Sequence, residues 1–197
     1  MSNINTNVEK CHFTSRATLI ALGLRVKQMK IMDTIGQYVS INQKTVQDSP
    51  LEKMTDALVT ILAGGQGLVE ANKLVGSDLA VQQAFGRERC AEQSVISETL
   101  NACTAENIEQ MSQAWLALYR QHSEGYRHNY QQEWQLLDID LSGQPCGPKA
   151  AFASKGYFAH QRNRRGRQLG RVWATWYDEA VVDQIYPGNT TLHTCLP

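Results

Sequence analysis

Two aspartates in the C-terminal third of the chain could bind a metal ion. Asp138 and Asp140 are two residues apart in Trp134-Gln-Leu-Leu-Asp-Ile-Asp-Leu-Ser142, a run with the composition of a β-strand. This spacing places both carboxylates on one face of a strand. Mg²⁺ would offset the cost of keeping them side by side, and paired Mg²⁺ ions can catalyse phosphodiester chemistry. Solvated acids on an edge strand are the alternative that the spacing leaves open.

A run of arginines follows the two aspartates. Residues 160–171 contain five arginines and no acidic residue. We expect a hairpin over residues 155–176 that carries the arginines at or near its tip. A guanidinium can pair with phosphate oxygens, so the cluster could contact nucleic acid, whereas a solvated basic turn is the alternative. The cluster consists of Arg162, Arg164, Arg165, Arg167 and Arg171.

A predicted helix over residues 91–102 gives a third candidate site. Two short helices precede it, an outline that resembles a helix-turn-helix. Gln93 and Ser94 would contact DNA from this helix, and Arg87 just before it could hold the DNA backbone. The same outline is common in folds that never touch DNA, which is the alternative here.

Helix start and stop signals place these candidate sites in an α+β chain. Ser49-Pro50 opens a helix that Gly64-Gly65 stops, and Asp78 and Thr104 cap later helices. We therefore expect a helical, DNA-binding module over residues 49–130. We expect a partly disordered N-terminal segment over residues 1–48, in which residues 20–32 fit a strand better than a helix.

The hydrophobic pattern changes period beyond residue 130. Three strands are expected, over residues 134–142, 155–160 and 168–176, followed by a helix opening at 179–185. Three strands with so little chain after them make a poor independent domain. Residues 131–197 therefore look like the start of a sheet rather than a whole one.

Composition and charge exclude several classes of protein. The 197 residues carry 19 basic and 19 acidic side chains, so only the clustering of charge is informative. No apolar run reaches the roughly 18 residues of a membrane span, and Met1 to Lys10 lack the apolar core of a secretory signal, so a cytoplasmic protein is expected. The five cysteines and five histidines show no zinc spacing.

Several segments resemble bacterial insertion-sequence DDE transposases. The runs Asp56-Ala-Leu-Val-Thr-Ile-Leu-Ala-Gly-Gly65 and Ala84-Phe-Gly-Arg-Glu-Arg-Cys-Ala-Glu-Gln-Ser-Val-Ile-Ser-Glu-Thr-Leu100 are similar to the family's helical N-terminal region. Leu137-Asp-Ile-Asp-Leu-Ser-Gly143 is similar to its first catalytic strand. Two segments are similar to the family's later strands, Lys155-Gly-Tyr-Phe158 and Asn163-Arg-Arg-Gly-Arg-Gln-Leu-Gly170. Tyr186-Pro-Gly-Asn189 is similar to the family's segment after those strands. The order of these segments carries the resemblance.

The resemblance implies a ribonuclease-H-like catalytic domain whose Asp, Asp and Glu hold two Mg²⁺ ions. The first acid corresponds to Asp140, with Asp138 as the alternative ligand, and the other two acids have no counterpart before Pro197. We therefore expect an N-terminal, truncated transposase that is inactive alone but binds the terminal inverted repeats of double-stranded DNA. The implied setting is the bacterial nucleoid, with no membrane partner and a homodimer as the assembly.

Two other functions compete with the truncated transposase. One is a regulatory DNA-binding protein, derived from a transposase, that competes for the element's ends. The other is an unrelated helical interaction protein with a small sheet appended.

Overall fold

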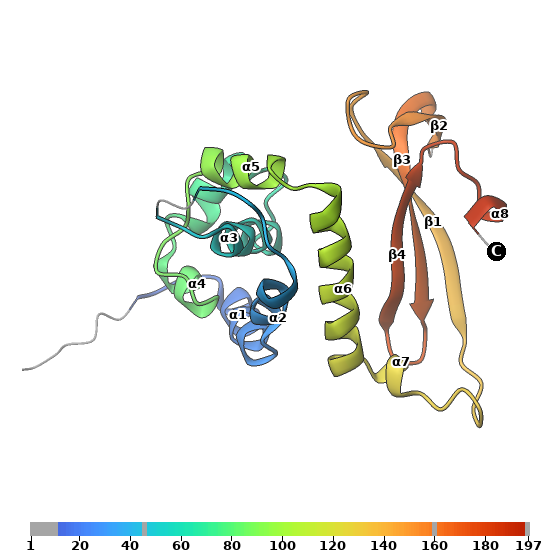
Figure 1. Cartoon of the computed structure of the whole chain (residues 1–197), viewed down its shortest axis with the longest axis horizontal. Helices are drawn as coiled ribbons and strands as arrows, with labels where there is room; N and C mark the ends of the chain where they lie inside the picture. Colours follow the sequence, from blue (N-terminus) through green and yellow to red (C-terminus); the bar gives the residue numbers. More distant parts are fainter. Residues whose placement is uncertain (1–11, 45–46, 159–160, 196–197) are drawn as a thin grey trace, which may run out of the picture. The chain divides into compact units, whose positions relative to one another are not determined.

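The computed structural model describes residues 12–44, 47–158 and 161–195, without the side chains of Tyr157 and Arg162. The chain divides into two compact units, Met1–His122 and Ser123–Pro197, which are described separately (Figure 1). The described helices of the first unit and the antiparallel sheet of the second make a mixed α+β fold, as expected. No helix in the described part of the chain has the length and apolar character needed to cross a membrane.

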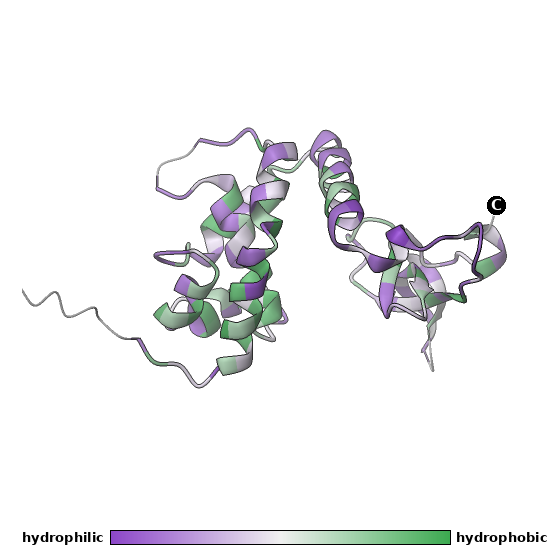
Figure 2. Cartoon of the chain, turned by 90° about the horizontal axis from the view of Figure 1, so that it is seen from below, coloured by the Kyte–Doolittle hydropathy of each residue, from purple (hydrophilic) through white to green (hydrophobic). Residues whose placement is uncertain are grey.

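The first unit is helical throughout its described elements. In Figure 2 its helices carry both hydrophobic and hydrophilic stretches, as amphipathic helices around a core do. The α-helices are α1 (Ala17–Gln28), α2 (Ile31–Tyr38), α3 (Pro50–Leu62), α4 (Leu79–Ala84), α5 (Gln93–Asn101) and α6 (Ala105–His122). Between α3 and α4 lie a 3-10 turn, η1 (Leu68–Glu70), and a π turn, η2 (Ala71–Val75).

The predicted helix starts from Ser49 onward are confirmed. Ser49 forms a capping box with Glu52 at the start of α3, and Pro50 is the first helical residue. The Asp78 carboxylate accepts from the Val81 amide at 3.1 Å, and the Thr104 hydroxyl accepts from the amide three residues later at 3.3 Å. These caps satisfy amides that a helix start leaves without an intrahelical partner.

The expectation of a strand over residues 20–32 is wrong, since this segment forms α1 and the start of α2. Leu19 and Gly23, one helical turn apart, are both buried. A Cβ at Gly23 would lie 2.8 Å from the Phe85 ring, so this face of α1 packs directly on Phe85. Leu19 belongs to one core cluster with Val59 and Val75. Residues 12–44 and 47–48 thus belong to the helical unit, and residues 1–11, part of the segment expected to be partly disordered, lie outside the described residues.

The second unit is a sheet of four described strands. A short helix, α7 (Glu124–Arg127), precedes β1 (Leu137–Pro145), β2 (Ser154–Phe158), β3 (Gln161–Ala174) and β4 (Glu179–Pro187), and α8 (Leu192–Cys195) follows them. All pairings are antiparallel: β1 lies on one side of β3, and β2 and β4 follow each other along its other side. The long strand β3 therefore holds the sheet together.

Two expectations for this unit are corrected. Residues 179–185 form strand β4 instead of a helix, because Val182 and Ile185 pair across the ladder with Val172 and Leu169. The arginine segment lies within β3, whereas it was expected to be a turn, and the strand starts at Gln161. The sheet thus has four described strands instead of three, and a ribonuclease-H-like identity stays a prediction.

Candidate nucleic-acid interface

The antiparallel pair β2–β3 carries a group of cations that we call the basic arm. Lys155 on β2 lies directly opposite Arg165 on β3. Arg167, two residues further along β3, shares that face of the sheet, and Arg164 lies on the other face, opposite Gly156. Lys155, Arg164 and Arg165 are exposed and Arg167 is half-buried. Arg162 also lies on β3, but its side chain is outside the described residues.

The cations of the basic arm have no acidic partner in the described structure. None of the ion pairs among residues 12–44, 47–158 and 161–195 includes Lys155, Arg164, Arg165 or Arg167. The Arg167 Nε–H is buried and has no hydrogen-bond acceptor among those residues. A buried donor without an acceptor costs free energy, and an anion that accepts from it would remove that cost. The arm can therefore offer an anion both positive charge and a hydrogen-bond donor.

Close backbone packing holds the base of the arm. Phe158 is 3% exposed and covers the backbone of Gly143 and Gly166 on neighbouring strands. A Cβ at Gly143 would lie 2.7 Å from the Phe158 ring, so only glycine fits beneath it. The Gly188 carbonyl packs against Gly156 in the same way. These contacts explain why glycines interleave with the cations in this part of the sequence.

Arg171, the fifth candidate arginine, is engaged differently from the others. Its Nε and Nη2 donate to the two Asp183 carboxylate oxygens at 2.7 and 2.6 Å. Hydrogen bonds to Asp183 raise the pKa of the Arg171 guanidinium. Arg171 also lies directly opposite Asp140 on β1. Because its charge already faces acids on both neighbouring strands, Arg171 is the least available of the arginines for phosphate.

The two aspartates expected to bind Mg²⁺ lie on strand β1. Asp138 and Asp140 are exposed on one face of β1, and the Asp140 carboxylate accepts from the Ser142 hydroxyl at 3.1 Å. Arg171 is the residue directly opposite Asp140 on β3, and its guanidinium binds Asp183. No group of three or more His, Cys, Asp or Glu side chains placed to hold a metal ion occurs among the described residues. The binding of Mg²⁺ by Asp138 and Asp140 remains a prediction.

Arg87, expected to hold a DNA backbone, is instead the centre of a buried ion cluster. Its guanidinium is bound by Asp48 at 2.9 Å, Glu52 at 2.6 Å and Asp56 at 2.9 Å, and only 6% of its side chain is exposed. Burial alone would lower the pKa of Arg87, but hydrogen bonds to Asp56 and Asp48 raise it. A phosphate would have to displace these carboxylates, so the Arg87 guanidinium is not available to DNA in this arrangement.

The sequence held a signal for this cluster. Glu52 and Asp56 are four residues apart, so they lie on one face of the helix that the Ser49-Pro50 signal predicts. Two acids on a helix that packs into a core require a buried cation, and Arg87 supplies it.

The two helix candidates differ in exposure. Ser94 is exposed near the start of α5, whereas Gln93 is half-buried and its Oε1 has no donor among the described residues. The Gln93 amide donates to the Asn72 side chain at 3.2 Å, which fixes the start of α5 on η2. Ser94 thus remains available to a ligand, and both residues belong to the first unit while the basic arm belongs to the second.

Comparison of the chain with known protein families, with characterised proteins and with solved structures finds no match.

Proposed function

We propose that this chain binds double-stranded DNA through the basic arm of its second unit. The observation that carries the proposal is the Lys155–Arg165 pair: two like charges directly opposite each other on an exposed ladder, with no acid among the described residues to separate them. Like charges in this position destabilise a sheet. A polyanion that binds both cations removes the repulsion.

The distribution of charge along the second unit supports the same function. Residues 141–177 contain seven lysines and arginines and no acidic residue, although the whole chain has a net charge of zero. The cations are therefore concentrated in the segment that forms β2 and β3. Such clustering on one element, and not total charge, produces an electrostatic surface for nucleic acid.

The two-stranded shape of the basic arm is also suited to the major groove of DNA. The major groove of B-DNA is wide enough for a two-stranded β-ribbon. Arg165 and Arg167 alternate with Gly166 along β3, so two guanidinium groups on one face can reach phosphates while the glycine backbone packs inward. Arg164, on the opposite face, can reach a phosphate of the other strand.

Binding is tested by fluorescence anisotropy with a labelled 20-base-pair duplex. The full chain should bind, and Lys155→Gln with Arg165→Gln and Arg167→Gln should weaken binding at least tenfold. Arg25→Gln with Lys27→Gln and Lys73→Gln, which removes three exposed cations of the first unit, is the matched control and should bind as the parent does. Equal affinity of the triple variant and the parent would overturn the proposal, and so would tight binding to single-stranded RNA with none to the duplex.

This proposal covers the DNA-binding part of the activity implied by the resemblance to insertion-sequence transposases. Strand cleavage and transfer by Asp140 stay a prediction of that resemblance. The regulatory alternative, in which the chain competes for the ends of an element, needs only the proposed binding. A duplex carrying an inverted repeat, compared with a scrambled duplex, separates specific from general binding.

A further inference from the structure

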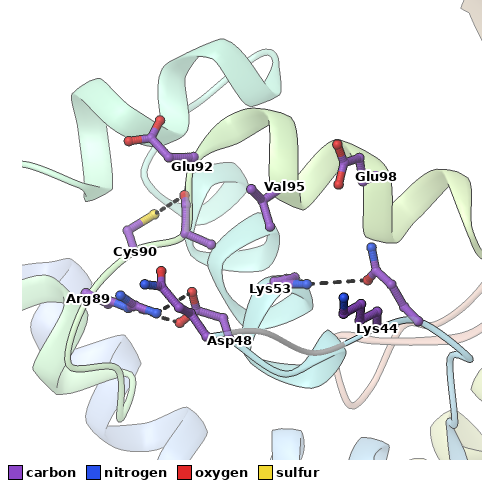
Figure 3. A pocket seen from close by; sticks show the side chains of 11 residues that line it. Lys44, Asp48, Lys53, Arg89, Cys90, Glu92, Val95 and Glu98 are labelled. Carbon is purple, nitrogen blue, oxygen red and sulfur yellow. Dashed lines mark hydrogen bonds and ion pairs between the residues drawn. The ribbon is translucent and has the colours of Figure 1, made fainter.

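A cavity of about 480 Å³ opens in the first unit, beside the buried ion cluster of Arg87 (Figure 3). It is lined by residues of α3 and α5, by residues 89–92 before α5, and by Gln43, Lys44, Gln47 and Asp48 before α3. The volume is within the range of pockets that hold small molecules. Among the described residues, its charged lining side chains are three cations and three acids: Lys44, Lys53 and Arg89, and Asp48, Glu92 and Glu98.

Lys53 is the unusual member of this lining. The residue is 4% exposed, and the partner of its ammonium among the described residues is the Gln43 Oε1 at 3.4 Å. That oxygen also accepts from the Thr99 hydroxyl at 2.6 Å, a much shorter bond. A buried ammonium held only by a long bond to a neutral amide is costly. Lys53 is therefore suited to receive a negative group from a ligand.

Asp48, the member of the ion cluster that lines the cavity, is paired with arginines and not with Lys53. Asp48 is bound by Arg87 at 2.9 Å and by Arg89 at 2.9 Å, so both of its oxygens are already used. Glu92 accepts from the Asn72 amide at 2.9 Å. Lys53 thus has no carboxylate within ion-pair distance in the described part of the chain.

Glu98 gives the cavity a negative charge in addition to the positive charge of Lys53. In Figure 3 it extends from α5, and Lys53 and Lys44 lie on the other side of the cavity. Glu98 is exposed and forms no ion pair with the described residues. The site therefore offers one buried cation and one acid that is free of cations.

The balance of charge selects the ligand class. Three cations and three acids line the cavity, so the sum of their formal charges is zero. A phosphate dianion would leave two uncompensated negative charges beside Asp48 and Glu92. A small molecule with one charge of each sign leaves none, and in a partly enclosed cavity uncompensated charge is expensive.

We propose that this cavity binds a small zwitterion of the α-amino-acid class, with the carboxylate on the Lys53 ammonium and the ligand ammonium toward Glu98. The site lies in the first unit and is independent of the proposed DNA binding. Arg89 and Lys44 flank the ligand, and Val95 supplies an apolar contact for its side chain.

The twenty common L-amino acids, each at up to 10 mM, are titrated singly into the full chain and followed by saturation-transfer NMR. At least one should bind, and acetate and methylammonium, which each carry half of the recognised charge, should bind at least tenfold more weakly. Lys53→Met keeps the length of the side chain and should abolish the signal. Lys73→Met, an exposed lysine outside the cavity, is the matched control and should leave binding unchanged.

Glu98→Gln lies on the exposed side of α5, so it tests the site without disturbing the core. It should weaken the responding amino acid at least fivefold and leave acetate unaffected. The proposal is overturned if no amino acid gives a Lys53-dependent signal, if Glu98→Gln binds as the parent does, or if inorganic phosphate binds more tightly than every amino acid.

Discussion

The dependence of DNA binding on salt gives a quantitative prediction for the basic arm. A protein that neutralises Z phosphates releases their counterions, and log K falls against log salt concentration with a slope of about −0.9 Z. Lys155, Arg164, Arg165 and Arg167 are the four described cations of the arm without an ionic partner. Four contacts give a slope of about −3.6, so raising salt from 50 to 200 mM should weaken binding about 150-fold.

Arg165→Gln removes one of these contacts. The slope should fall to about −2.7, and the same change in salt should then weaken binding only about 40-fold. The variant should fold as well as the parent, because the substitution removes a charge that lies opposite Lys155. Fluorescence anisotropy at five salt concentrations measures both slopes.

The controls distinguish the arm from general attraction to DNA. Arg25→Gln changes the net charge of the chain equally but lies on α1 of the first unit, so its slope should match that of the parent. Arg171→Lys keeps the charge but loses the fork that binds Asp183, and it should leave the slope near −3.6. A slope for Arg165→Gln equal to that of the parent would refute the assignment of phosphate contacts to the arm.

Three further predictions concern stability and reactivity. Arg87→Met leaves buried carboxylates uncompensated and should lower the free energy of unfolding, measured in urea, by about 3–5 kcal/mol. Arg89→Met should lower it by less than about 1 kcal/mol, because the Arg89 side chain is 49% exposed. Equal losses for the two variants would contradict the central role of Arg87 in the ion cluster. Burial would raise the pKa of Glu179, but hydrogen bonds from Ser123 and two backbone amides lower it. The ionised carboxylate therefore stabilises the folded chain above pH 4.5, the ordinary pKa of a glutamate, and this stabilisation should be lost as the pH falls below that value. Thermal unfolding between pH 7 and 3 measures this, and Glu179→Gln should flatten the profile. Burial raises the pKa of Cys90 to about 12, so iodoacetamide at pH 8 should alkylate exposed Cys103 first, and faster alkylation of Cys90 would count against that burial.

The helices from Ser49 onward could be predicted because their signals are local. Ser49, Asp78 and Thr104 accept hydrogen bonds from amides within their own first turns, so no distant residue is needed to recognise them. The α1 helix could not be predicted in this way. Its alternating hydrophobic residues fit a strand, and it becomes helical because Leu19 and Gly23 pack on residues such as Phe85, more than 60 positions away in the chain.

The candidate sites also differ in whether local sequence or contacts between distant residues define them. The arginines of the second unit could be located from sequence because their clustering is itself the signal, although their place within β3 depends on the ladder with β1 and β4. The role of Arg87 depends on acids 31 to 39 residues away, and composition does not reveal such pairs. The cavity around Lys53 was not anticipated, because a buried lysine is identified only by the packing of α5 against α3.

The most direct test of the DNA-binding proposal observes the arginine side chains themselves. The full chain, labelled with ¹⁵N-arginine, is titrated with a 20-base-pair duplex, and each Nε–Hε signal is assigned by an Arg→Lys substitution. The proposal predicts saturable shifts for Arg164, Arg165 and Arg167 and none for Arg25 or buried Arg87. Saturation of the duplex with no change at the three arginines of the basic arm would contradict it.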